Sequence, residues 1–221
     1  MKGLPRTISD KWLKTGVLLK HKGIAGCIPE TQRYSEHRLR HMLDRYGSVV
    51  AKPATGTGGR GLMLLRKHRG GYSCHYYGRI KRVGSFRELA RRVDRIRRHR
   101  SYLLQQAIQL ASIGGRPVDY RVKTIRRSGR WRIRAIVGRL ARPGLFVTNL
   151  CRGGLQLRAN KAIRRSLSVN PARKIREMQR LTYQSASLLS RAFPGLDQLG
   201  FDYGLDTRGR VWMFEVNTKP K

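Results

Sequence analysis

Apolar residues recur along most of the chain at spacings that predict helices and short strands. Four segments have the three-to-four-residue apolar period of amphipathic helices, and these are residues 9–22, 35–46, 86–100 and 170–193. Between and after them lie shorter runs of strand character, at residues 48–52, 62–66, 72–82, 102–106, 119–126, 131–140, 200–206 and 211–220. The pattern therefore predicts a chain in which helices and strands are mixed.

Capping residues and apolar stripes define the ends and faces of two of these helices. In the first helix, Ser9 is the predicted cap, and the predicted apolar stripe is Trp12, Leu13, Val17 and Leu18. The long helix begins at Asn170, which is followed by Pro171, a residue suited to the first helical turn. Both helices are therefore expected to pack one face against a core.

The two C-terminal strands carry oxygen-bearing side chains at matching positions. Asp202 lies on the first strand, and Glu215 and Asn217 lie on the second, after a turn at residues 206–209. Side chains alternate along a strand, so Glu215 and Asn217 leave the same face. Oxygen donors of this kind suit Mg²⁺, which takes one or two carboxylates plus substrate phosphates. The chain has only 12 acidic residues, so carboxylates gathered here indicate a cation.

A glycine-rich loop follows the strand at residues 48–52. Gly56, Gly58 and Gly61 match G-x-G-x-x-G, but residues 62–65 have strand character, whereas a dinucleotide-binding fold needs a helix there. The loop also lacks the Gly-Lys-Ser/Thr ending of a Walker A loop. Two interpretations remain. One is a loop that presents backbone N–H groups to phosphates, with Lys52 adding a charge; the other is a plain glycine-rich hairpin.

The balance of charge is strongly basic. Lysine and arginine number 49 against 12 acids, which gives a formal net charge of +37. Arginine binds phosphate and carboxylate with two parallel hydrogen bonds, so the composition favours nucleotide or polyanion partners. A solvated arginine surface explains the same composition. For the basic face of the helix at residues 86–100, solvation is the favoured interpretation, because no aromatic residues interleave with its arginines for base stacking.

Cysteine content and hydropathy bear on the compartment. Cys27, Cys74 and Cys151 are odd in number and lack metal-binding spacing, which is typical of a reducing compartment without a disulfide framework. The sequence contains no apolar run of the ~18 residues that a membrane span requires. We therefore expect a cytoplasmic protein without a membrane partner.

Six segments in order resemble the ATP-grasp superfamily, and within it the YheC/YheD-type group that is linked with spore coats. They are Lys-Pro-x-x-Gly-x-Gly-Gly-x-Gly, Leu-Leu-Gln-Gln-Ala-Ile, Asp-Tyr-Arg-Val, Thr-Asn-Leu-x-Arg-Gly-Gly, Phe-Asp-x-Gly-x-Asp and Glu-Val-Asn-x-Lys-Pro. The resemblance extends over about residues 9–220. It implies an α+β ATP-grasp fold, in which two lobes with antiparallel sheets hold the nucleotide between them.

The resemblance also implies a division of the chain. Residues 1–30 would form an N-terminal helix and linker, residues 31–108 the small lobe, and residues 109–221 the large lobe. Relatives usually carry a separate α/β domain before the grasp lobes, and here we expect it to be missing. The resemblance also implies that the protein, expected in the cytoplasm, would be associated with spores.

Site residues follow from the resemblance by position. Lys11 and Lys52 would contact phosphates. The mobile phosphate loop would comprise Gly56, Thr57, Gly58, Gly59 and Gly61. The strand that reads adenine would comprise Gln105, Gln106, Ala107 and Ile108. The Mg²⁺ ligands would be Asp202, Glu215 and Asn217. Arginines near the γ-phosphate and the acceptor would be Arg121, Arg139 and Arg152.

Three functions stay open from the sequence. The first is an ATP-dependent carboxylate–amine ligase that uses Mg²⁺ and forms an acylphosphate, which places negative charge where Mg²⁺ and arginines can neutralise it. The second is a non-catalytic ATP-binding structural protein associated with the spore coat. The third is a polyanion or nucleic-acid binding module. The carboxylate and amine acceptors are unspecified, and an acidic peptide or polymer acceptor would join the third idea to the first.

Overall fold

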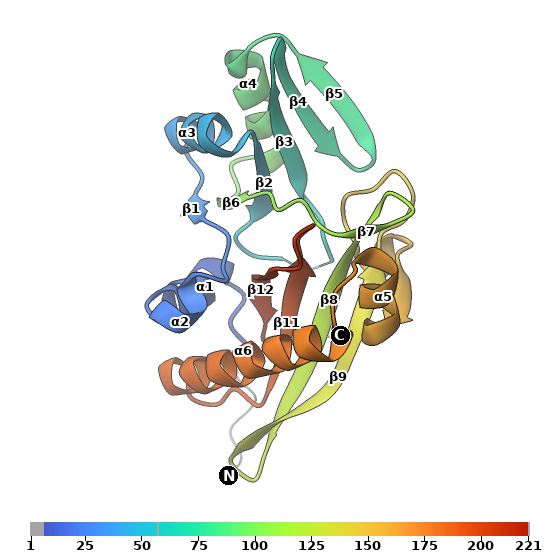
Figure 1. Ribbon diagram of the computed structural model, residues 1–221. Helices are drawn as coiled ribbons and strands as arrows, with labels where there is room; N and C mark the ends of the chain where they lie inside the picture. The colour runs from blue at the N-terminus through green and yellow to red at the C-terminus, as the bar shows by residue number, and fades with distance from the viewer. Residues whose placement is uncertain (1–6, 57, 221) are drawn as a thin grey trace. The chain divides into compact units, whose positions relative to one another are not determined.

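A computed structural model describes residues 7–56 and 58–220 of the chain, coloured from blue to red in Figure 1. The chain forms two compact units. Unit 1 contains the described residues up to Ile28, Gln109–Pro143 and the residues from Val147 onward; unit 2 contains Pro29–Ile108 and Gly144–Phe146. Each unit is built on an antiparallel sheet covered by helices. The α+β class with two antiparallel sheets is therefore confirmed.

Unit 2 is built on a six-stranded sheet of order β1-β6-β2-β3-β4-β5, in which every neighbouring pair is antiparallel. Its strands are β1 (Thr31–Arg33), β2 (Ser48–Pro53), β3 (Met63–His68), β4 (Gly71–Tyr76), β5 (Arg79–Val83) and β6 (Tyr102–Gln106). Its helices are α3 (Glu36–Tyr46) and α4 (Phe86–Arg97).

Local signals explain both helices of unit 2. The hydroxyls of Ser35 and Ser85 accept hydrogen bonds from the first turn of α3 and α4, respectively. Gly47 ends α3 in the left-handed conformation that glycine adopts without a steric cost. The apolar face of α3 packs on β2, β3 and β6, and that of α4 packs on β4 and β5. The fully buried side chains include Leu39, Met42, Leu43, Leu89, Val93, Val49, Leu65 and Leu104.

Unit 1 is built on a sheet of order β10-β9-β8-β11-β12, with the short β7 pairing beside β8. Its strands are β7 (Ser112–Ile113), β8 (Arg116–Arg127), β9 (Arg130–Leu140), β10 (Leu155–Arg158), β11 (Gln198–Leu205) and β12 (Val211–Asn217). Its helices are α1 (Lys11–Leu19), α2 (Lys22–Ala25), the 3₁₀ helix η1 (Leu150–Arg152), α5 (Ala159–Ser166) and α6 (Pro171–Ala192).

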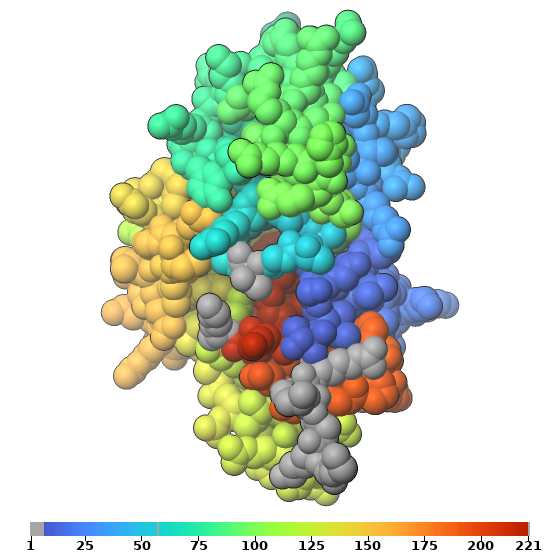
Figure 2. All heavy atoms as spheres, turned by 180° about the vertical axis from the view of Figure 1, so that it is seen from behind, coloured from blue at the N-terminus to red at the C-terminus, as the bar shows by residue number. Residues whose placement is uncertain are grey.

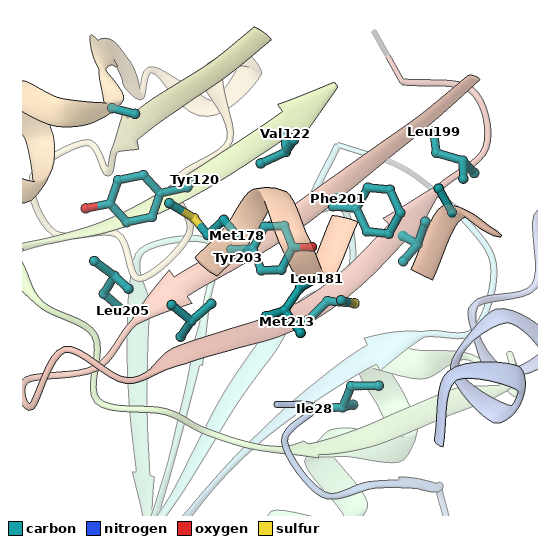
Figure 3. Close-up of a cluster of buried hydrophobic side chains, with 14 of the residues drawn as sticks. Ile28, Tyr120, Val122, Met178, Leu181, Leu199, Phe201, Tyr203, Leu205 and Met213 are labelled. Carbon is teal, nitrogen blue, oxygen red and sulfur yellow. The ribbon is translucent and has the colours of Figure 1, made fainter. Parts of the chain in front are cut away.

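The long helix α6 covers one face of the unit 1 sheet. Asn170 caps it as predicted, by accepting a hydrogen bond from Arg173 N at 3.1 Å. Figure 3 shows Met178 and Leu181 of α6 beside the inward-facing Tyr203 of β11. No helix in the described ranges combines the length and the apolar character that crossing a membrane requires. Because alternate residues of each strand face α6, the intervening residues lie on the other face of the sheet, which carries the candidate site.

The N-terminal helix differs from its prediction in cap, length and buried face. Asp10 rather than Ser9 is the cap, and accepts from Trp12 N at 2.7 Å. The helix stops at Leu19, and a separate short helix, α2, follows. Leu13, predicted to be buried, is 49% exposed, whereas Lys11, Lys14 and Leu18 are the buried residues of α1. Leu18 and Val17 contribute to the core as predicted. The two lysines were missed because long lysine stems can bury their methylenes when the ammonium finds a partner.

Candidate functional site

The three predicted metal ligands lie on one face of the unit 1 sheet. Asp202 on β11 stands directly opposite Glu215 on β12, and Asn217 follows two residues later. The adjacent Phe201 and Val216 are buried in the core, so alternation places the three polar side chains on the opposite face. Asn217 Nδ2 donates to Asp202 Oδ2 at 3.2 Å. The hairpin therefore gathers two carboxylates and an amide, a donor set whose chemistry suits Mg²⁺.

Two of the three predicted arginines bind Asp202. Arg121 Nε donates to Asp202 Oδ1 at 2.5 Å, and its Nη2 donates to Oδ2 at 2.9 Å. Arg139 Nη2 donates to Asp202 Oδ1 at 2.8 Å. The register of the sheet accounts for the first pair, because Arg121 of β8 is the direct partner of Asp202 across the strands. The site thus holds a carboxylate between two guanidinium groups.

Asp119 belongs to the same network, although the sequence did not indicate it. Its two oxygens accept from Arg139 Nε at 2.7 Å and Nη2 at 2.6 Å. Asp119 and Arg139 are direct cross-strand partners on β8 and β9 and are 7% and 6% exposed. The spacing of Asp119 two residues before Arg121, which puts both on one face, is the signal that could have found it. Asp119, Arg139, Asp202 and Arg121 form a neutral chain of alternating charge.

The arginines determine the ionisation of Asp202. Burial alone would raise the pKa of this carboxyl group, but the guanidinium groups of Arg139 and Arg121 outweigh burial and hold its pKa below the usual value. Asp202 is therefore a carboxylate at neutral pH. Removing one member of such a buried network leaves an uncompensated charge, which makes the network sensitive to substitution.

Helix α1 brings two lysines to the same face. Lys11, the predicted phosphate contact, has its Nζ 3.7 Å from Glu215 Oε1, and the two side chains are 9% and 20% exposed. Lys14, which the sequence did not indicate, lies one turn further along and donates from Nζ to Ile8 O at 2.5 Å. Figure 2 shows the blue atoms of α1 beside the red atoms of the C-terminal strand. Burial lowers the pKa of Lys14 to about 8.

In unit 2, the other predicted phosphate lysine is held by a neutral side chain. Lys52 of β2 donates from Nζ to Gln105 Oε1 at 2.9 Å, and Gln105 Nε2 donates to Thr31 Oγ1 at 2.9 Å. Thr31 in turn donates to Pro29 O at 2.8 Å. Lys52 and Gln105 are 6% and 5% exposed. The Gln105 side chain, predicted to belong to the adenine-reading strand, thus orients Lys52.

The glycine loop joins two antiparallel strands, β2 and β3, as the strand-like residues after it predicted. Gly56, Gly58, Gly59 and Gly61 all have positive φ angles, between 67° and 114°, which glycine adopts without strain. At Gly61 a Cβ would come within 2.7 Å of the Tyr102 hydroxyl, which donates to Gly61 O at 3.0 Å. The end of the loop is therefore fixed by packing. Thr57, also predicted to belong to the phosphate loop, lies outside the described residues.

The remaining predicted residues lie in two places. Gln106, Ala107 and Ile108 end the β6 segment of unit 2, where the backbone N–H of Gln106 bonds Glu30 O at 2.8 Å and that of Ala107 bonds Ser48 O at 3.2 Å. Arg152 ends the 3₁₀ helix η1 in unit 1 and is half-buried. Their roles toward a nucleotide stay predictions.

Solved structures with the same fold include synthases and ligases. A carboxyaminoimidazole ribonucleotide synthase from Aspergillus clavatus, complexed with ATP, aligns over 98% of this chain and 46% of its own, with a TM-score of 0.57 and 14% identity. A D-alanine–D-alanine ligase from Helicobacter pylori aligns over 98% of this chain and 54% of its own, with a TM-score of 0.55 and 16% identity. At these identities the likeness shows the ATP-grasp fold.

Sequence relatives place the chain more closely. It is 27% identical over 228 residues to the endospore coat-associated protein YheD of Bacillus subtilis (strain 168), covering 97% of this chain and 49% of YheD. It is 27% identical over 224 residues to the endospore coat-associated protein YheC of the same strain, covering 97% of this chain and 61% of YheC. The chain thus spans about half to three-fifths of these relatives. The family profile described as YheC/D like ATP-grasp matches residues 4–221, and the chain belongs to this family.

Proposed function

We propose that this chain binds Mg²⁺-ATP and uses it to join a carboxylate to an amine. The observation that carries the proposal is the common face of Asp202, Glu215 and Asn217, which also holds Arg121 and Arg139. Family membership and ligase structures of the same fold support the general reaction class. The three oxygen-bearing side chains are the proposed Mg²⁺ ligands.

The donor set fits a hard dication. Asp202 and Glu215 supply negative charge from adjacent strands, and Asn217, which donates its amide N–H to Asp202, keeps its amide oxygen as an acceptor. Within the described residues, no group of three or more His, Cys, Asp or Glu side chains is placed to hold a metal ion. The proposed ligand set differs from such groups because its third member is the Asn217 amide. When bound, Mg²⁺ would neutralise phosphate charge and polarise the transferred phosphoryl group.

The basic residues would respond to occupancy of this site. Arg121, Arg139 and Lys11 now contact the oxygens of Asp202 and Glu215. A dication on those carboxylates competes with all three side chains, and any guanidinium that it releases is available to phosphate or carboxylate groups. Asp119 retains a two-bonded hold on Arg139 in either case. We propose that Asp119 keeps Arg139 in place while Arg121 is freer to exchange partners.

The proposed reaction has two steps. An oxygen of the substrate carboxylate attacks the γ-phosphorus of ATP, and the bond to the bridging oxygen breaks, which gives an acylphosphate and ADP. The amine nitrogen then attacks the acyl carbon, loses a proton and expels inorganic phosphate. The chain's residues bind and orient the anionic groups, and Arg121 and Arg139 supply positive charge in a partly buried setting.

The test is ADP release from ATP with Mg²⁺ and a panel of carboxylates and amines. We expect acceptor-dependent release that falls at least about a hundredfold in Glu215→Gln, because loss of one charged ligand removes stabilisation of several kcal/mol. The matched control is Glu36→Gln, an exposed glutamate in the first turn of α3, and it should retain activity. Equal turnover in the two variants would contradict the assignment of Glu215.

A second candidate is a nucleotide-binding structural protein of the spore coat. It is favoured by the printed names of YheD and YheC, which are endospore coat-associated. This candidate predicts Mg²⁺-dependent ATP binding without turnover for any acceptor. Measuring ATP affinity beside ADP release separates the candidates, since the ligase requires both.

A further inference from the structure

The hairpin of β8 and β9 extends beyond the rest of the unit 1 sheet. β11 pairs with β8 no further than Ile125, and β10 pairs with β9 only from Val137 to Leu140. The turn end of the hairpin is therefore a two-stranded ribbon, which Figure 1 shows running past the ends of β11 and β12. In Figure 2 its yellow-green atoms reach the lower surface. A ribbon in this position offers a face that other strands do not cover.

The two faces of the ribbon differ in chemistry. On one face Trp131, paired with Arg126, lies toward α6, where its Nε1 donates to Ser190 Oγ at 3.4 Å. The other face carries Arg127 and its direct partner Arg130, followed by Arg132, whose partner is Ile125. These three arginines are exposed. Within residues 7–56 and 58–220, no ion pair engages any of them.

The exposed arginines continue a row of cations that begins at the candidate site. Strand alternation puts Arg121, Lys123 and Arg127 of β8 on one face. Arg121 binds Asp202, so one end of this row is the candidate site itself. At about 3.4 Å per residue, the row spans roughly 20 Å from Arg121 to Arg127. We call Arg121, Lys123, Arg127, Arg130 and Arg132 the cationic strip.

The strip is distinct from the general basicity of the chain. The sequence has no acidic residue between Asp119 and Glu177, so the whole ribbon lacks internal counter-ions. The basic helix α4 of unit 2 carries its own acids, Glu88 and Asp94, and Asp94 binds Arg97 Nε at 2.5 Å. An anion therefore meets less local competition on the strip than on α4.

We propose that the cationic strip binds an acidic peptide in extended conformation, and that this peptide is the carboxylate substrate. Arginine side chains bind carboxylates through two parallel hydrogen bonds, and the 20 Å length matches about six residues of an extended chain. Trp131 faces α6, so it is not on the strip to stack nucleobases. The peptide partner rests on the proposed ligase function, since that reaction requires a carboxylate near Arg121 and Arg139.

The test measures peptide binding without ATP, so that it is separate from turnover. The probe is a fluorescein-labelled peptide of about eight glutamates, chosen to span the strip, and its glutamine counterpart is the neutral control. In fluorescence anisotropy we expect the variant R127E/R130E/R132E to bind the acidic peptide about tenfold to a hundredfold more weakly than the native chain. The matched control R87E/R91E/R95E makes the same charge change on exposed positions of α4 and should change affinity less than about threefold.

Several outcomes would overturn the proposal that the cationic strip binds an acidic peptide. Equal weakening in the two triple variants would mean that the net charge alone attracts the peptide. Tighter binding of a short duplex DNA than of the peptide, lost in the ribbon variant, would assign the strip to nucleic acid. The milder variant R127Q/R130Q/R132Q, compared by circular dichroism and thermal unfolding, guards against misfolding and should also bind more weakly. If the peptide binds the strip but no acceptor gives turnover, the ligase proposal fails while the binding surface stands.

Discussion

The two sheets of the molecule hold their buried cations in different ways. In unit 1, Arg121 and Arg139 are bound to the carboxylates of Asp202 and Asp119, so positive and negative charge cancel within the sheet. In unit 2, Lys52 donates to the neutral amide of Gln105, which is itself bound to Thr31. The first arrangement joins groups of opposite charge, whereas in the second a neutral amide orients a cation.

This difference assigns different tasks to the two sheets. A neutralised network can exchange partners when a dication or an anion arrives, because each new contact replaces an existing one. The lysine of unit 2 is oriented through a hydrogen bond to a neutral amide. We infer that the unit 1 sheet responds to ligand, whereas the hydrogen bonds of the unit 2 sheet fix the position of Lys52. Substitutions in the two networks should therefore differ in cost.

The largest effect is expected at the centre of the unit 1 network. Asp202→Ala leaves Arg121 without its partner carboxylate and leaves Arg139 with Asp119 alone, in a site that is 14% exposed at the Asp202 side chain. Breaking a buried pair of this kind costs about 3–5 kcal/mol of unfolding free energy, measured by urea denaturation. Asp44→Ala removes an exposed partner of Lys67 and should leave stability unchanged. Similar losses in both variants would show that the network is not a buried, coupled unit.

Lys14 tests the cost of a buried cation in unit 1 that is hydrogen-bonded to a backbone carbonyl rather than to a carboxylate. Burial lowers its pKa from 10.5 to about 8, so the unfolded chain binds more protons than the folded chain between these values. The free energy of unfolding therefore rises as pH increases from about 8 to 10.5. This added stability is lost as pH falls back through the window, and none of it remains below about 8. Relative to Lys14→Met, the native chain should gain about 3 kcal/mol between pH 8 and pH 10.5. Parallel pH profiles would mean that the lysine is hydrated.

A smaller effect is expected in unit 2. Gln105→Leu removes the acceptor of Lys52 and the donor to Thr31, which leaves buried polar groups without these partners. The expected cost is about 1–3 kcal/mol, below that of Asp202→Ala because the lost partner is neutral. The half-buried neighbour provides the control Gln106→Leu, whose cost should be lower. A larger loss in Gln106→Leu would contradict the proposed orientation of Lys52.

Local patterns were sufficient for most of the fold. The alternation in residues 200–217 predicted the hairpin that carries Asp202 and Glu215, and β11 and β12 confirm it. The apolar period predicted α3, α4 and α6, and the cap at Asn170 predicted the start of α6, because those signals are local to each helix. The order of motifs indicated the ATP-grasp fold, which the structural comparisons show.

The charge network could not be predicted because it depends on contacts between distant strands. Asp119 meets Arg139, and Arg121 meets Asp202, through registers that include irregularities after Lys123 and after Asp202. A shift by one residue would turn these side chains to the other face, and no local signal fixes that choice. Lys14 and α5 were missed for a related reason, since the burial of each depends on packing against distant segments.

The central claim is that Asp202 and Glu215 hold Mg²⁺ for ATP, and the most direct measurement is ATP affinity with and without Mg²⁺. Isothermal titration calorimetry would compare the native chain with Glu215→Gln, using EDTA to remove the metal. The account predicts that Mg²⁺ tightens ATP binding by at least about tenfold in the native chain and by less than about twofold in Glu215→Gln. The same gain from Mg²⁺ in both proteins would contradict it.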